Sequence, residues 1–323
     1  MMQLGLIGIG AGAAAALLFA SVTSGSWLSI VLFYLAPLPI LIAGLGWSHW
    51  AAIVAALSGA LAVGAVFGSV LFFAFLAGAG IPAWWLSYLT MLARPGMAGG
   101  NGSAAPALEW YPPGRLVAWA AVLAALVVVV AIPNFGTDAE SFRLGLHQAL
   151  TRMFQIEGNT PGAISTDKLV GFLVIAIPPA AAVLATITNI LNLWLAARIV
   201  KFSGLLKRPW PDLAAIAFPR SMLAALAVAM AVSFAGGLIG VVAGVLSASL
   251  MMAYGALGFA VLHAVTRGIN SRPFLLGGIY ASVAVFGWPI LALCLIGVTE
   301  TAFDLRARAA RRRGPKGGPP TLT

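Results

Sequence analysis

The chain has 323 residues, of which 61% are hydrophobic and only 8% are charged, and its formal net charge is +10 at pH 7. Soluble domains average about 25% charged residues, so this composition excludes an ordinary globular protein. The basic residues stand in short segments beside hydrophobic runs, as the cytoplasmic loops of membrane proteins do, so we expect the lipid bilayer and not nucleic acid as the partner.

Apolar runs longer than the ~18 residues needed to cross a bilayer recur along the chain, and they predict an all-α, polytopic bundle of about 8–9 transmembrane segments. We expect one membrane domain over residues 1–305 and a basic, disordered tail over 306–323. The first charged residue is Arg94, so the chain begins without the basic region of a cleavable signal. The single Cys294 excludes a disulfide framework.

Small residues repeat at a spacing of four in the first apolar segment, Leu4 to Val22. They are Gly8, Gly12, Ala16 and Ala20. Such a stripe lets two helix backbones approach closely in lipid. It is either an internal packing face or a docking stripe for a membrane protein partner.

Prolines interrupt three of the apolar segments. Pro37 lies in the segment Leu28 to Gly46, Pro178 in Leu169 to Arg198, and Pro289 in Phe274 to Val298. A proline removes a backbone hydrogen bond, and the freed carbonyl must face protein or a water-filled cavity.

A polar insert at 134–168 predicts an amphipathic interfacial helix. It contains a capping-box pattern, Thr137-x-x-Glu140, followed by apolar residues at helical spacing: Phe142, Leu146, Leu150, Met153 and Phe154. Such a helix is suited to the membrane interface. It is either a connector lying on the surface or a lid over a site.

A polar stripe follows Pro178 in the same segment, with Thr186, Asn189 and Asn192 at successive spacings of three. With Pro178 and Pro37 these residues are candidates for the wall of a ligand cavity, and His263, near the end of the segment Leu246 to Val265, joins the set. The alternative is a set of hydrogen bonds between helices.

Catalytic patterns are missing. Mid-span acidic residues, paired carboxylates, an H-E-x-x-H motif and a nucleophile elbow do not occur. We therefore expect a protein that is not an enzyme, with neither a catalytic residue nor a metal or cofactor site.

Charge distribution predicts the orientation. The basic connection from Arg198 to Arg220 should be cytoplasmic, which places the N-terminus inside. One further span through Phe274 to Val298 would put Arg306 and the following arginines outside, against the rule. Either that segment is a re-entrant pair bent at Trp288-Pro289, or the segments between 222 and 299 are miscounted. We expect a cytoplasmic C-terminal tail and location in a bacterial inner membrane.

Four stretches carry a family resemblance: Tyr34 to Trp47 (YLAPLPILIAGLGW), Asn192 to Leu213, Gly255 to Gly268 and Gly297 to Ala309. Together they resemble the YybS-like family of bacterial membrane proteins of unknown function, over nearly the whole chain. That family is remotely similar to the S-components of energy-coupling-factor vitamin transporters and to the rod-shape protein MreD.

The resemblance implies a helical membrane fold and a small-molecule pocket. S-components dock their transmembrane partner through small residues of the first helix, which here would be the stripe from Gly8 to Ala20. The chain departs from the pattern in having more segments than an S-component and Glu300 where the family's terminal motif has an aspartate.

The leading hypothesis is therefore a membrane protein that binds or helps to move a small solute, uncharged or zwitterionic. It has no P-loop and so would have no ATPase of its own. The alternative is a non-enzymatic scaffold in cell-envelope organisation, similar to MreD.

Overall fold

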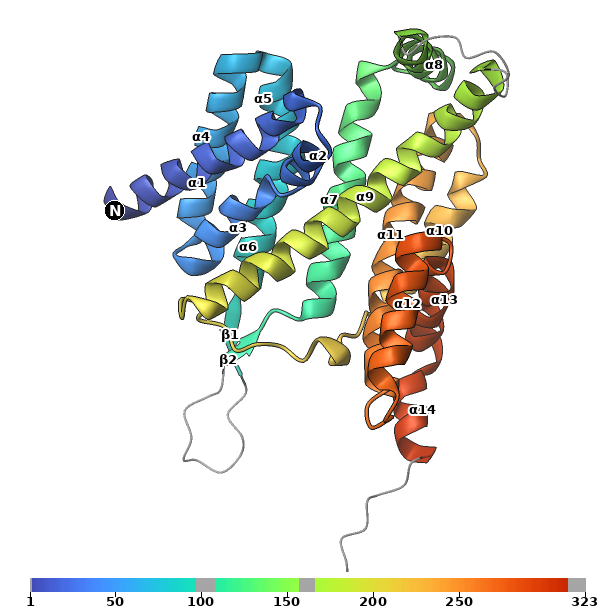
Figure 1. The fold of residues 1–323 in the computed structure, drawn as a ribbon. Coiled ribbons are helices and arrows are strands. Elements are labelled where there is room, and N and C mark those ends of the chain that lie inside the picture. Colours follow the sequence, from blue (N-terminus) through green and yellow to red (C-terminus); the bar gives the residue numbers. More distant parts are fainter. Residues whose placement is uncertain (1, 97–107, 157–165, 313–323) are drawn as a thin grey trace, which may run out of the picture.

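Helices make up nearly all of the part of the chain that this computed structural model describes, residues 2–96, 108–156 and 166–312 (Figure 1). The strands within these ranges form one antiparallel hairpin of β1 (Ala93–Pro95) and β2 (Leu108–Trp110). Seven of the described helical segments are long and apolar enough to cross a membrane, and three shorter apolar helices accompany them. The predicted all-α bundle is confirmed, while the predicted count of 8–9 transmembrane segments stays a prediction.

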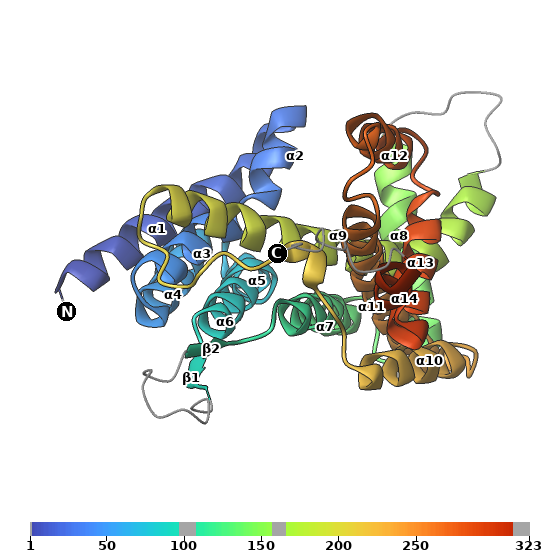
Figure 2. The same ribbon diagram turned by 90° about the horizontal axis from the view of Figure 1, so that it is seen from below.

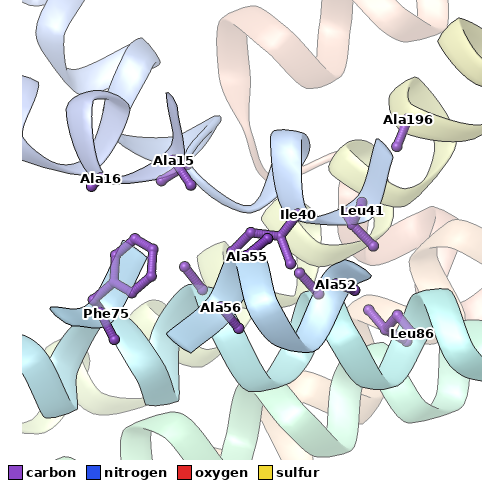
Figure 3. Close-up of a cluster of buried hydrophobic side chains, with 14 of the residues drawn as sticks. Ala15, Ala16, Ile40, Leu41, Ala52, Ala55, Ala56, Phe75, Leu86 and Ala196 are labelled. Carbon is purple, nitrogen blue, oxygen red and sulfur yellow. The ribbon is translucent and has the colours of Figure 1, made fainter. Parts of the chain in front are cut away.

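The first half of the molecule packs small residues against one another (Figure 3). Ala15 of the first helix and Ala55 of the fourth are fully buried, together with the ring of Phe75. Small side chains let the helix backbones come close in lipid. The helices of this half are α1 (Met2–Ala20), α2 (Trp27–Tyr34), α3 (Pro37–Gly46), α4 (His49–Phe67), α5 (Ser69–Phe75) and α6 (Ile81–Thr90), with a 3-10 turn η1 (Ser21–Ser24) and a π-helical turn η2 (Leu76–Gly80).

The second half forms a separate group of helices beside the first (Figures 1 and 2). Its core surrounds the fully buried Tyr254 and includes Phe218 and Leu257. Its helices are α7 (Pro113–Ala131), α8 (Ala139–Ile156), α9 (Thr166–Phe202), α10 (Arg220–Ser233), α11 (Gly237–Val265), α12 (Arg272–Phe286), α13 (Ile290–Phe303) and α14 (Leu305–Arg312), with 3-10 turns η3 (Ile132–Asn134) and η4 (Leu213–Ala215).

The 37-residue helix α9 joins the two halves. It runs obliquely across the molecule in Figure 1, from the second half at its start to the first half at its end. Ala182 packs with Ala125 of α7 and Val245 of α11, whereas Ala196 and Val200 belong to the core of the first half. Most other elements are therefore positioned by their contact with α9 or with a neighbour of α9.

The predicted boundaries in the last third of the chain are wrong. The sequence predicted a segment that begins at Leu246, but the chain turns at Gly236 and Gly237, where φ is +71° and +62°. Glycine adopts positive φ without steric cost, so the turn forms there and α11 continues through Gly244.

The segment Phe274 to Val298 is not one span but the two short helices α12 and α13, separated at Gly287 and Pro289. This division removes the conflict over the C-terminal arginines. Arg267, before α12, binds Asp212, and Arg306, after α13, binds the backbone of Ala214. Both ends of the α12–α13 pair therefore lie at the same connection, on one side of the molecule, as the re-entrant alternative predicted.

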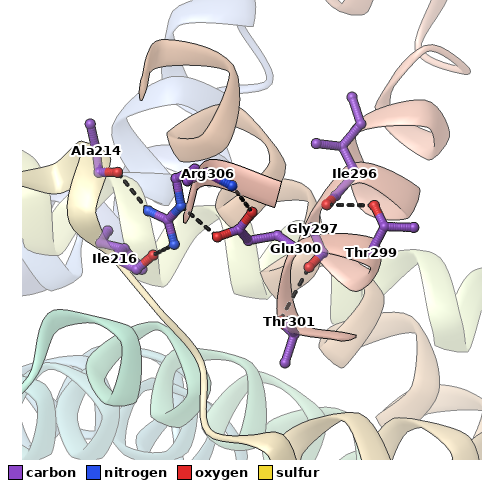
Figure 4. A network of polar contacts seen from close by, with 8 residues as sticks. All are labelled: Ala214, Ile216, Ile296, Gly297, Thr299, Glu300, Thr301 and Arg306. Atoms are coloured by element: carbon purple, nitrogen blue, oxygen red, sulfur yellow. Dashed lines mark hydrogen bonds and ion pairs between the residues drawn. The ribbon is translucent and has the colours of Figure 1, made fainter. Parts of the chain in front are cut away.

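Arg306 fixes the chain after α13 (Figure 4). Its guanidinium lies 2.7 Å from the buried Glu300 carboxylate and also donates to the carbonyl oxygens of Ala214 and Ile216. The predicted disordered tail from 306 is thus corrected in its first part, because α14 is a helix through Arg312. Residues 313–323 lie outside the described residues.

The amphipathic helix of the insert is present as α8, with two corrections. Its cap is Asp138 and not Thr137, since the Asp138 carboxylate accepts hydrogen bonds from the backbone N–H groups of Glu140 and Ser141. Its apolar face packs on protein and not on lipid, because Phe142 and its neighbours are buried against α9. The side chains of Met153 and Phe154 lie outside the described residues.

Candidate ligand-binding site

A cavity of about 520 Å³ lies between the two halves of the molecule. Its walls come from α1 and η1, the α2–α3 junction, the end of α4, α5 and η2, α7, and the middle of α9. The lining residues are Phe19, Ala20, Val22, Thr23, Phe33, Tyr34, Ala36, Pro37, Phe67, Leu71, Ala74, Gly78, Ala79, Val127, Ala181, Leu184, Ala185, Thr188 and Asn189. They are mainly apolar and aromatic, and none of them is charged.

Two interruptions of helix geometry leave room for this cavity. α2 ends at Tyr34, and α3 begins at Pro37, which changes the direction of the chain. On the facing wall, α5 passes into the π-helical turn η2, a geometry that is frequent at functional sites. Gly78 of that turn lines the cavity, and a Cβ at this position would meet no atom within 4 Å.

Asn189 supplies the buried polar group of the cavity. It is only 5% exposed, and its Nδ2 donates to the Ala120 carbonyl of α7 at 3.1 Å. Its Oδ1 has no protein partner among the described residues. Thr188 and Tyr34 also line this cavity. The cavity can therefore accept a hydrogen bond from a bound molecule and surround the remainder with apolar surface.

The rest of the predicted polar stripe lies outside this cavity. Thr186 is fully buried and donates to the Ala182 carbonyl at 2.8 Å and to the Ser249 hydroxyl of α11 at 3.3 Å. Asn192 donates to the carbonyl of Tyr34 at 2.8 Å, at the end of α2. Thr186, Asn189 and Asn192 thus tie α9 to three different helices, which is the hydrogen-bonding alternative.

The other candidate residues lie in different parts of the structure. Pro37 lines the cavity with Asn189. Pro178 instead lines a second cavity of about 270 Å³, next to Arg143 and Gly240. His263 lies between α11 and α12, where its Nε2 is 2.8 Å from the Tyr280 hydroxyl. The structure therefore does not bring Pro178 or His263 to the larger cavity.

Of the two alternatives for the small-residue stripe of α1, the structure shows the internal packing face. A Cβ on Gly8 would lie 2.7 Å from the Val54 side chain of α4, and one on Gly12 would overlap the Ser58 hydroxyl. Ala16 is also buried, and Ala20 lines the cavity. Because α4 of the same chain occupies this face, a partner protein cannot reach it.

Sequence reasoning missed Tyr34 and Gly78. Tyr34 had a local signal, because it lies just before the interruption at Pro37. Gly78 had a weaker one, the run of alternating glycine and alanine before Pro82. A π-helical turn has no sequence pattern that distinguishes it from an ordinary transmembrane helix.

Charged groups gather at the end of the molecule away from η1. There the Arg94 side chain binds Glu109 and lowers the pKa of that carboxyl, and Arg267 does the same to the pKa of Asp212. The Arg208 guanidinium is buried beside the Thr90 carbonyl, and burial lowers its pKa. Within the described ranges, no group of three or more His, Cys, Asp or Glu residues could hold a metal ion.

No protein-family model, curated protein or solved structure matches this chain.

Proposed function

We propose that this membrane protein binds a small, mainly apolar solute in the cavity between its two halves, in the manner of a transporter S-component. The observation that supports the proposal is the buried amide of Asn189, whose Oδ1 is free within an apolar space. Ligand sites have volumes of about 300–1,000 Å³ and combine apolar walls with a few polar groups, and this cavity has both properties.

The lining favours an uncharged solute over a zwitterionic one. Burying a charge in an apolar site is costly unless an opposite charge or several hydrogen bonds compensate it. The cavity offers no charged side chain, while Asn189 and Thr188 can orient a single hydroxyl or amide of the solute. Membership of the YybS-like family stays a prediction, as do the bacterial inner membrane location and the cytoplasmic position of the basic end.

The cavity lies towards the turns η1 and α4–α5, as its lining residues Thr23 and Phe67 show. The basic connections stand at the opposite end of the bundle, which the positive-inside rule assigns to the cytoplasm. The solute would therefore enter from the side of the membrane away from the cytoplasm.

Native mass spectrometry of the gently solubilised protein tests the proposal, because it reports bound small molecules and protein partners together. We expect the wild type to retain a small molecule. Asn189→Leu should lose it by removing the hydrogen-bond acceptor, and Gly78→Leu should lose it by filling the cavity. Gly10→Leu is the matched control, since a Cβ on Gly10 also meets no atom within 4 Å but lies outside the cavity.

An empty wild-type protein that co-purifies with envelope-synthesis proteins would overturn the proposal in favour of the MreD-like scaffold. Retention of the molecule by both Asn189→Leu and Gly78→Leu would also contradict it, since the bound molecule would then lie elsewhere.

A further inference from the structure

The last turns of α9 present an exposed stripe in which one cation stands between two aromatic rings. Trp194, Arg198 and Phe202 follow at a spacing of four and so lie on one face of the helix. Trp194 is 46% exposed and Phe202 is 80% exposed. The Arg198 guanidinium lies 4.9 Å from the centre of the Phe202 ring.

A second cation joins Arg198 at Trp210, in the connection that follows α9. The guanidinium carbon of Arg198 lies 5.3 Å from the centre of a Trp210 ring, and the Lys201 Nζ lies 4.9 Å from it. Both distances are within the reach of a cation–π interaction. The indole thus lies within reach of two positive charges, which repel each other.

Protein carboxylates do not neutralise this pair. At this end of the described chain, the carboxylates of Glu109, Asp212 and Glu300 are already bound to other arginines, namely Arg94, Arg267 and Arg306. Neither Arg198 nor Lys201 has an ion pair within the described residues. An anion from outside the chain would therefore remove the repulsion between them.

The depth of the stripe indicates which anion this is. Tryptophan prefers the headgroup level of a bilayer, and Trp194 stands one turn of α9 before Arg198. One turn further into the membrane, Leu191 is 57% exposed and offers apolar surface to a lipid chain. Arg198 and Lys201 accordingly stand at the level of lipid phosphates.

We propose that Arg198, Lys201 and Trp210 form a binding site for the phosphate of an anionic phospholipid in the leaflet at the basic end. Clusters of basic residues at the ends of transmembrane helices bind anionic headgroups in this way. The site is separate from the ligand cavity, and it stands whether or not that cavity holds a solute.

The test uses full-length protein in nanodiscs made from equal amounts of phosphatidylglycerol and phosphatidylcholine. Native mass spectrometry after release measures the ratio of the two lipids that stay bound. We expect the wild type to retain phosphatidylglycerol preferentially. The double variant Arg198→Gln/Lys201→Gln should lower this preference by about fivefold for each cation removed.

The matched control is Arg115→Gln/Arg220→Gln, which removes the same charge from exposed positions at the same end of the molecule. It should keep most of the preference, whereas Trp210→Leu should reduce it because the cations lose the ring that gathers them. A thermal-unfolding arm in phosphatidylcholine nanodiscs compares added phosphatidylglycerol with inorganic phosphate, and only the lipid should stabilise the wild type.

Equal loss in the test and control doubles would overturn the proposal, because the preference would then follow net charge alone. Equal stabilisation by inorganic phosphate would also overturn it, since the site would then not recognise a lipid. An unfolded double variant is distinguished by its thermal transition, and in that case Trp210→Leu decides.

Discussion

Asn189 and Asn192 lie three residues apart on α9, yet they contact different parts of the molecule. The Nδ2 of Asn192 donates to the end of α2, and the Nδ2 of Asn189 donates to α7. The Oδ1 atoms of both are without a partner among the described residues, but only Asn189 lines the cavity. The sequence predicted that both are buried amides in an apolar helix, because their spacing places them on one stripe. The sequence could not predict that the two amides have different partners, because the partner of each depends on which helix packs against α9 at that position.

The ion pair of Glu300 with Arg306 leads to the first prediction. Glu300→Gln removes the charge that Arg306 binds while the site is largely buried, with side chains 7% and 20% exposed. Breaking a buried pair in this way costs about 3–5 kcal/mol. We expect α14 to detach from the connection after α9, measured as faster proteolysis after Phe303 and a lower unfolding temperature.

Asp304→Asn is the control for this prediction. It makes the same change of acid to amide at an exposed neighbour, and its φ of +52° is a conformation that asparagine tolerates. Unchanged proteolysis in Glu300→Gln would show that the carbonyls of Ala214 and Ile216 hold Arg306 without the carboxylate.

The cap of α8 predicts a dependence on pH. Hydrogen bonds from the Ser141 hydroxyl and from the backbone N–H groups of Ser141 and Glu140 lower the pKa of Asp138 below the ordinary range of an aspartate. A lowered folded-state pKa stabilises the folded state above the unfolded pKa, and this stabilisation is lost as the pH falls through the folded value. The attachment of α8 should therefore weaken below about pH 4.

Thermal unfolding of the wild type and Asp138→Asn between neutral and acidic pH measures this effect. Asparagine keeps a capping oxygen but does not titrate, so the two curves should converge in acid. A constant difference between the two proteins at all pH values would show that Asp138 acts without its charge.

At the level of the helices, the close contact of α1 with α4 leads to a further prediction. Gly12→Val should destabilise the protein, because a larger side chain overlaps the Ser58 hydroxyl and comes within 2.5 Å of the Ala55 carbonyl oxygen. Overpacking of this kind costs about 1–3 kcal/mol. Unfolding in a mild detergent, followed by tryptophan fluorescence, measures it.

Gly10→Val provides the comparison, since it makes the same change on the same helix where no atom lies within 4 Å. Equal unfolding temperatures for Gly12→Val and wild type would mean that α1 does not pack on α4 through this face.

Several helices could be predicted because long apolar runs have a length that the bilayer imposes. The predicted segments Leu4 to Val22 and Leu28 to Gly46 belong to this group, as does α9. The short helices α10, α12 and α13 could not, because positive-φ glycines at Gly236 and Gly287 divide apolar sequence that continues on both sides. Hydrophobicity alone cannot show such a division. The positive-inside rule did indicate such a division, because a single span through Phe274 to Val298 would have placed Arg306 on the wrong side of the membrane.

At the scale of the whole molecule, the paired helices α12 and α13 predict that the chain after α13 returns to the side of the α9–α10 connection. In a Cys294→Ser background, cysteines at Ser203 and Ala307 should react together with a membrane-impermeant maleimide from one side. A cysteine at Ala235, in the turn between α10 and α11, should react only from the other side.

Burial would not prevent labelling at these positions, because Ser203, Ala235 and Ala307 are all exposed. Labelling of Ser203→Cys and Ala307→Cys from opposite sides would contradict the arrangement of α12 and α13, and with it the joining of Arg306 to the carbonyl of Ala214.

The length of α9 has a mechanical consequence. At about 1.5 Å per residue, 37 residues extend for roughly 55 Å, far more than the ~30 Å thickness of the hydrocarbon layer. A helix with such hydrophobic mismatch accommodates by tilting, and a change in bilayer thickness alters its tilt. The two ends of α9 are packed in different halves, and the cavity lies between those halves. A change in the thickness of the surrounding membrane should therefore change the width of the cavity.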